Sequence, residues 1–252
     1  MAGNQEHWHR RLLEGRTGLF TALVTVGILI GGIVELTPMF AAGGGAVGET
    51  DVEPYTPLEL AGRDIYIREG CYNCHSQMVR PMRAETVRYG EWSRMEEYRW
   101  ERPFQLGSRR IGPDLHRTGW QSLERPVPRY NNLWHYNHML DPRSTSEGSV
   151  MPAYPWLANW RIDVDNVTAV VGAMATLGVP YDDVSAEAVE ASLQAQAQAI
   201  VDDLESTHAG NNADAEALGV EWDHEIVALI AYLQSLGTNF EAATGLTAGG
   251  DE

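Results

Sequence analysis

Two cysteines and a histidine with the potential to hold a redox cofactor occur together in one five-residue stretch. Cys71 and Cys74 are separated by two residues, and His75 follows at once. This C-x-x-C-H spacing is typical of c-type haem attachment, in which two thiols one short turn apart add to the haem vinyl groups. The histidine is then carried beneath the iron as its proximal ligand. We therefore predict one covalently bound haem c, attached through Cys71 and Cys74 and ligated by His75.

Two other kinds of protein site contain a C-x-x-C pair. Thioredoxin-type redox pairs and halves of zinc sites share the spacing, but no βαβ pattern surrounds this one. A zinc site would need further ligands, and Cys71 and Cys74 are the only cysteines among the 252 residues. The adjacent histidine and the flanking pattern favour haem attachment.

A second axial ligand is expected from the C-terminal side of the haem motif. Electron transfer favours two strong axial ligands, and methionine opposite histidine is the high-potential choice. Met151 lies in a loop stiffened by prolines and well separated from His75, and many c-type cytochromes present their distal sulfur from such a Met-Pro pair. Met151 is our predicted ligand, although spacing alone does not exclude Met95 or Met139. Three histidines are the alternatives for bis-histidine ligation: His116, His135 and His138.

Residues 112–119 read G-P-x-L-x-x-x-G. This segment resembles the loop by which c-type cytochromes support the proximal histidine. The resemblance implies that the carbonyl of Pro113 accepts a hydrogen bond from Nδ1–H of His75. Such a bond orients the imidazole and raises its basicity.

An apolar run from 17 to 40 is interrupted only by Glu35. A stretch of about 20 such residues is enough to cross a bilayer. Arginines precede the run and acidic residues follow it, so we expect 1–16 on the cytoplasmic side and the bulk of the chain outside. A secretory signal peptide is the alternative, but the run exceeds the usual length of a signal core.

Small residues within this span favour a membrane partner. Gly27 and Gly31 form a G-x-x-x-G pair, a spacing that lets a second transmembrane helix approach closely. Glu35, near the outer end, is a weaker functional candidate because ionisable groups at that depth are often functional.

The expected fold is mainly α: a single N-terminal transmembrane helix followed by a cytochrome c-type helical domain with long loops. A flexible tether is predicted over 41–55, the haem domain over 56–237 and a disordered tail over 238–252. Within the domain, Thr56 and Glu59 form a capping box for a helix that ends before Gly70. Apolar periodicity predicts three later helices, at 163–177, 185–207 and 223–236. In a cytochrome c fold the last of these crosses the first helix near Gly62 and Tyr66.

The formal charge of −17 is unevenly distributed. All 18 basic residues are arginines, and none lies beyond Arg161. Such an acidic C-terminal third argues against nucleic acid, whose phosphates would repel it. It would suit a cationic electron donor, but a solvated acidic surface is the interpretation that we favour. We expect some of the arginines between 79 and 130 to pair with the haem propionates or with a partner surface.

Taken together, these motifs resemble one family, the membrane-anchored monohaem subunit (subunit II, FixO or CcoO type) of cbb3-type cytochrome c oxidase. The match runs through GGIVE at 31–35, IYIREGCYNCHSQMVRP at 65–81, PFQLGS at 103–108, GPDL at 112–115, DPRS at 141–144, MPAYP at 151–155 and AYLQSLG at 231–237. It extends over nearly the whole chain from the anchor to Gly237. The acidic segment 181–222 departs from the family pattern.

The resemblance implies an electron relay in a bacterial inner membrane. Electrons would come from a dihaem cytochrome c subunit or a soluble cytochrome c, and pass through this haem to haem b of the catalytic subunit. That partner would reduce oxygen at a haem b3–copper centre and pump protons, while this chain would bind no copper. The ligands of the family fall on Cys71, Cys74, His75 and Met151, and the haem domain would lie on the periplasmic side.

Other functions remain as alternatives. A free-standing membrane-anchored cytochrome, or the cytochrome subunit of a nitric oxide reductase, would share the anchor and the haem. A haem sensor or peroxidase-like enzyme would need an open sixth position. None of these accounts as well for the long block around Cys71.

Overall fold

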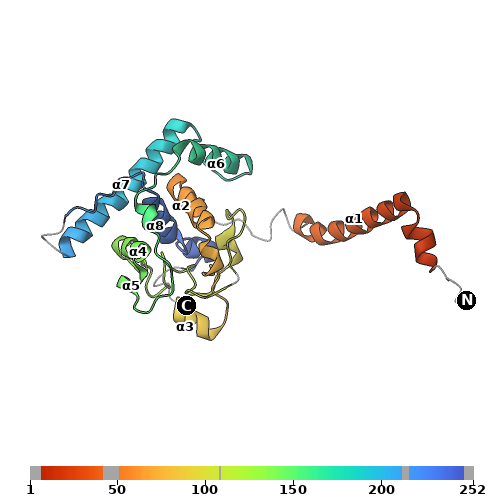
Figure 1. Cartoon of the computed structure of the whole chain (residues 1–252), viewed down its shortest axis with the longest axis horizontal. Coiled ribbons are helices and arrows are strands. Elements are labelled where there is room, and N and C mark those ends of the chain that lie inside the picture. Colours follow the sequence, from red (N-terminus) through yellow and green to blue (C-terminus); the bar gives the residue numbers. More distant parts are fainter. Residues whose placement is uncertain (1–6, 42–50, 108, 212–215, 247–252) are drawn as a thin grey trace, which may run out of the picture. The chain divides into compact units, whose positions relative to one another are not determined.

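The computed structural model describes residues 7–41, 51–107, 109–211 and 216–246. These residues form helices joined by long loops, and the β pairings among them are isolated bridges. The chain divides into two compact units, 1–49 and 50–252 (Figure 1). The predicted fold class, mainly α with one N-terminal membrane-spanning candidate, is confirmed.

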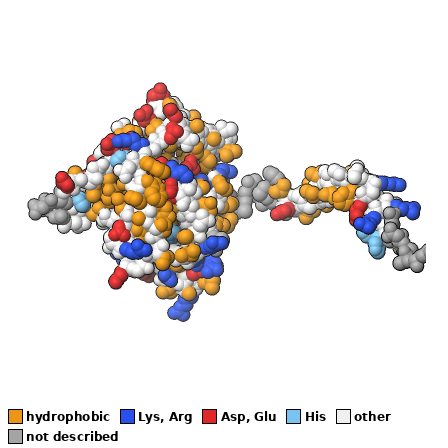
Figure 2. Space-filling model, viewed as in Figure 1, with side chains coloured by type: hydrophobic (Ala, Val, Ile, Leu, Met, Phe, Trp, Pro, Cys, Tyr) orange, Lys and Arg blue, Asp and Glu red, His pale blue; other side chains and the backbone are white. Residues whose placement is uncertain are grey.

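The N-terminal unit consists of a short π-helical turn, Arg10–Glu14, and α1, Thr17–Ala41. Within α1, Thr17–Thr37 has a mean hydropathy of 2.2. This segment is long and apolar enough to cross a membrane. Its leucine, isoleucine and valine side chains are exposed, as Figure 2 shows by the orange surface of this helix.

The second unit begins with α2, Pro57–Arg68, which starts at the predicted capping box. The backbone N–H of Glu59 donates to Thr56 Oγ1 at 3.3 Å, and the backbone N–H of Thr56 donates to the Glu59 carboxylate at 2.9 Å. These two bonds satisfy donors that the first helical turn leaves free. They fix where the helix leading to Cys71 begins.

Helix α8, Glu225–Ser235, crosses α2 at the centre of this unit (Figure 1). At Gly62 the two backbones are so close that a Cβ would lie 1.9 Å from the carbonyl oxygen of Ala228. One turn further on, the rings of Tyr66 and Tyr232 lie 5.4 Å apart. The predicted crossing near Gly62 and Tyr66 is therefore confirmed.

Other helices surround this pair, and α8 contacts α2, α4 and α7. As a result, every residue from 225 to 233 is buried, although the sequence predicted only one apolar side. The remaining helices are α3 Arg83–Tyr89, α4 Asn132–Leu140, α5 Pro142–Thr145, α6 Val164–Thr176, α7 Ala186–Asn211 and α9 Phe240–Thr244, with 3-10 turns at Cys71–Asn73, Met95–Tyr98 and Pro155–Ala158.

The two flanks of the domain differ from the sequence expectation. The tether was predicted over 41–55, but Val52 is buried and the Trp100 indole N–H donates to its carbonyl at 2.7 Å. The tail was predicted to be disordered from 238, but α9 forms there and Phe240 is fully buried against Trp120, with ring centroids 4.5 Å apart. Residues 42–50 and 247–252 lie outside the described residues. The described parts of both segments, 51–55 and 238–246, are therefore tied to residues far away in the sequence.

Charge separates across the surface of this unit. In Figure 2, acidic side chains lie along the edge formed by α6 and α7, and arginine side chains gather toward the end that carries α3. Five buried apolar residues of α7 pack against the core of this unit: Val189, Leu193, Ala197, Val201 and Leu204.

Candidate haem-binding site

The C-x-x-C-H stretch folds as a single tight turn directly after α2. Gly70 adopts φ 72°, a left-handed conformation that suits glycine, and so ends the helix. The backbone N–H groups of Cys74 and His75 then donate to the carbonyl of Cys71 at 3.1 and 2.9 Å. Both thiols are free, with Cys71 partly buried and Cys74 exposed. The turn holds two thiols and an imidazole within five residues, as haem attachment requires.

His75 is held by a residue far away in the sequence. Its Nδ1–H donates to the carbonyl of Pro113 at 2.8 Å. Burial lowers the pKa of His75 below its ordinary value. The bond to Pro113 and the charge of Asp114 offset only part of this effect. The net effect is a neutral imidazole at pH 7 whose Nε2 keeps its lone pair, which is the form that binds iron.

Gly112 makes this contact sterically feasible. A Cβ on Gly112 would lie 2.3 Å from Cε1 of His75 and within 3 Å of both ring nitrogens. Its backbone N–H donates to the carbonyl of Cys74 at 3.0 Å. The 112–113 segment is thus a cradle shaped to the ring of His75, and only glycine fits at its first position.

The environment of the thiols disfavours the alternative cysteine chemistries. Burial raises the pKa of Cys71 to about 12, and the carboxylate of Glu69 adds to the effect. A thioredoxin-type nucleophile needs a lowered thiol pKa instead. Within the part of the chain that the structure describes, no three His, Cys, Asp or Glu side chains gather as a zinc site would require.

The loop that carries Met151 packs against the same hydrophobic core as the haem motif. Cys71, Met151 and Tyr154 are all partly buried against this core, and burial, followed by the charges of Cys71 and Cys74, raises the pKa of Tyr154. The loop is held by the backbone N–H of Tyr154, which donates to the carbonyl of Met139 at 2.7 Å. Met151 is half-buried against the core. By contrast, Met95 is 55% exposed, while Met139 is buried within the core.

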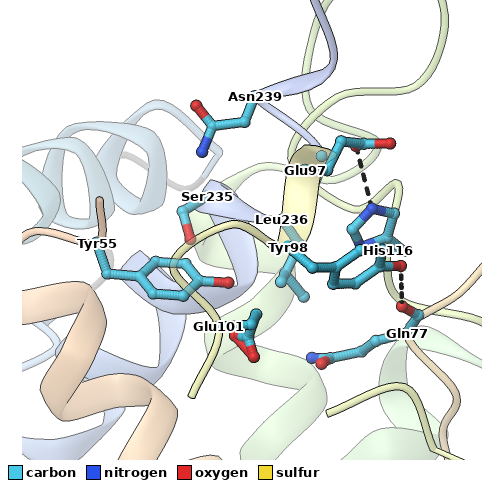
Figure 3. Close-up of a pocket in the computed structure, with 10 residues that line it drawn as sticks. Tyr55, Gln77, Glu97, Tyr98, Glu101, His116, Ser235, Leu236 and Asn239 are labelled. Carbon is cyan, nitrogen blue, oxygen red and sulfur yellow. Dashed lines mark hydrogen bonds and ion pairs between the residues drawn. The ribbon is translucent and has the colours of Figure 1, made fainter. Parts of the chain in front are cut away.

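Among the alternative histidines, His116 belongs to a separate buried cluster. Its Nε2 lies 3.1 Å from the carboxylate of Glu97, and its ring stacks on Tyr98 with centroids 4.7 Å apart. Figure 3 shows these residues around a cavity of about 20 Å³, which is far too small for a haem. The hydroxyl of Tyr98 donates to the carbonyl of Gln77 at 2.7 Å and so ties this cluster to the segment after the haem motif.

The other two histidines lie on α4. His135 is buried, and burial lowers its pKa to about 3, with a further contribution from His138. The pKa of His138 is lowered first by burial and then by the charge of His75, so His138 is close enough to interact with the haem motif electrostatically. Thr145 holds Nδ1 of His138 at 2.6 Å.

The sequence patterns single out neither α4 nor Asp114. The start of α4 had a sequence signal, because asparagine is a preferred N-cap residue. In the structure the side chain of Asn131 accepts from the backbone N–H of Trp134 at 2.8 Å. Asp114 occupies a variable position of the G-P-x-L pattern, so nothing in the spacing distinguished it. Several arginines already have acidic partners, among them Arg63 with Glu101 and Arg110 with Glu85.

A comparison with known protein families assigns the chain to one of them. The family model described as "Cytochrome C oxidase, mono-heme subunit/FixO" matches residues 9–240. The chain belongs to the FixO family. No curated protein matches the chain.

Membership of this family establishes that the chain is a cytochrome c oxidase subunit. FixO proteins are the mono-haem subunits of cbb3-type cytochrome c oxidase, so the chain is part of an oxidoreductase complex that contains a catalytic subunit. The family carries one haem, and α1 is the candidate anchor of this membrane-bound subunit. The oxidase assignment replaces the free cytochrome, nitric oxide reductase, sensor and peroxidase alternatives at the level of family.

Proposed function

We propose that this FixO-family chain relays electrons through one haem c to haem b of the catalytic subunit of a cbb3-type oxidase. Cys71 and Cys74 form the two thioether bonds, and His75 and Met151 are the axial ligands. The donor is the dihaem cytochrome c subunit or a soluble cytochrome c. Oxygen reduction, copper binding and proton pumping belong to the catalytic subunit.

The observation that carries this proposal is the contact between His75 and Pro113. A half-buried, neutral imidazole is held at Nδ1, beside two free thiols one turn away, and Gly112 fits closely against its ring. These donors fit a c-type haem, which supplies one-electron redox chemistry when bound. The residues of this chain fix the attachment points, hold the imidazole in one tautomer, and provide a soft thioether from the 149–155 loop.

The arrangement in the membrane is part of the same proposal. The arginines before α1 and the acidic residues after it favour an N-terminus in the cytoplasm. The haem domain then lies on the periplasmic side of a bacterial inner membrane, where c-type haems are exposed to periplasmic donors.

The direct test is purification of the chain from membranes in mild detergent through a tag, with haem b, haem c and copper quantified in the product. We expect haem b and copper in fixed ratio to the chain, together with oxygen uptake. Haem c alone would mean a free-standing membrane cytochrome. A chain without covalent haem would contradict the proposed attachment residues.

A further inference from the structure

Asp114 is a buried carboxylate at the centre of the contact between the haem motif and the 112–115 loop. Its side chain is fully buried. One carboxylate oxygen accepts from the Ser76 hydroxyl at 2.6 Å and from the backbone N–H of Met78 at 2.9 Å. The other accepts from the backbone N–H of His116 at 2.9 Å. Asp114 therefore joins the chain just after His75 to the loop that carries Pro113.

The guanidinium of Arg110 binds the same residues as Asp114. Arg110 donates from Nε to the Ser76 hydroxyl at 2.7 Å and from Nη2 to the carbonyl of Met78 at 2.8 Å. Its Nη2 also lies 3.5 Å from the carboxylate of Asp114, and its Nη1 pairs with Glu85 at 2.5 Å. The charge of Asp114 is thus only partly neutralised, because the guanidinium is closer to Glu85.

Backbone hydrogen bonds on either side of Pro113 join the same two segments. Together with the bonds of Asp114 and Arg110 they form a clamp between the haem motif and the 112–115 loop. Gly112 N–H donates to the carbonyl of Cys74 at 3.0 Å, and Leu115 N–H donates to the carbonyl of Ser76 at 2.8 Å. Pro113 lies between these two bonds and has no N–H of its own. The backbone bonds of Gly112 and Leu115 therefore hold the Pro113 carbonyl against His75. The side chain of Asp114 binds the same loop to Ser76 and Met78.

We propose that Asp114 is a positioning residue that holds the Pro113 carbonyl on His75 and lowers the reduction potential of the haem. A buried negative charge stabilises the ferric state, which carries one more positive charge than the ferrous state. A firmly bonded, more basic imidazole acts in the same direction. This inference rests on the proposed ligation by His75.

The test is an optical redox titration of haem c in the purified detergent-solubilised complex. Asp114→Asn keeps the shape of the side chain and removes its charge, so we expect a higher reduction potential than in the wild type. Arg110→Gln removes the neutralising cation, so we expect a lower potential. A purely structural role would loosen the same clamp in both variants and shift both potentials in one direction. Asp163→Asn, which neutralises an exposed acid that caps α6, is the matched control and should leave the potential unchanged.

The outcomes separate this inference from the function on which it rests. Shifts of opposite sign support the role of Asp114. Equal potentials in wild type and Asp114→Asn, or two shifts of the same sign, overturn it while the haem remains attached. If Asp114→Asn does not accumulate, Arg110→Gln decides alone, and an unchanged or raised potential overturns the proposal. A wild-type chain without covalent haem would instead overturn the proposed function.

Discussion

Nδ1 of His75 and the carbonyl oxygen of Pro113 lie 2.8 Å apart although 38 residues separate them in the chain. The bond leaves Nε2 of the imidazole as the free nitrogen. It also makes the loop around Pro113 part of the haem site, because any shift of this loop changes the orientation and basicity of the ring.

Gly112→Ala tests how tightly that loop fits. The new Cβ would lie 2.3 Å from Cε1 of His75, so the ring or the loop must move. Overpacking of this kind costs about 1–3 kcal/mol, and we expect a perturbed haem spectrum together with a lower free energy of unfolding in urea. Gly172→Ala in α6 is the control, since no atom of the described residues lies within 4 Å of its added Cβ. It should raise stability by about 0.5–1 kcal/mol, and equal behaviour of the two variants would contradict the cradle.

Met151→Leu tests the proposed sixth ligand. The haem should stay attached through Cys71 and Cys74 but become high-spin and bind carbon monoxide, because the distal thioether is gone. Absorption spectra of the reduced protein with and without carbon monoxide measure this. Met95→Leu, at an exposed methionine, should keep the wild-type spectrum. A low-spin spectrum in Met151→Leu would move the ligand to another residue.

Glu97→Gln tests the buried ion cluster behind the haem motif. Burial by itself would raise the pKa of Glu97. His116 and Arg117, whose Nη2 donates to the Glu97 carboxylate at 2.9 Å, instead hold it at about 2. Removing one partner of a buried pair costs about 3–5 kcal/mol, so we expect that loss in the free energy of unfolding at pH 7. Glu221→Gln, in the exposed pair with Arg161, should change stability little.

The lowered pKa of Glu97 also predicts how the stability of the domain changes at acid pH. Because the folded-state pKa of Glu97 lies below its unfolded value near 4.5, its contribution is complete above that value and is lost as pH falls toward about 2. Urea unfolding between pH 5 and about 2 should therefore show a smaller loss of stability in Glu97→Gln than in the wild type. Parallel pH profiles of the two proteins would refute this assignment.

Gly27→Leu combined with Gly31→Leu tests the anchor as an interface. Among the residues that the structure describes, no atom lies within 4 Å of a Cβ added at either glycine, so the small face of α1 is open to a partner helix. We expect less haem b to co-purify per chain. Ile28→Leu, on the same helix, is the control, and undiminished co-purification of the double variant would rule out this face.

Local chemistry was readable from the residues themselves. The C-x-x-C-H turn, the capping box at Thr56 and the apolar run at 17–40 depend on neighbours within a few positions, so the sequence alone predicts them. The crossing of α2 and α8 was also predictable, because Gly62 marks a close approach in a fold that the haem motif had already indicated. The oxidase family could be inferred because its motifs extend over most of the chain.

Which distant groups meet depends on how the whole chain packs. Asp114 became significant because folding buries it against Ser76 and Met78, and His116 proved to belong with Glu97 and Arg117. Val52 and Phe240 are ordered by contacts with Trp100 and Trp120 that no local pattern encodes. Burial and long-range pairing depend on the packing of the whole domain, whereas turns, caps and spans depend on the residues beside them.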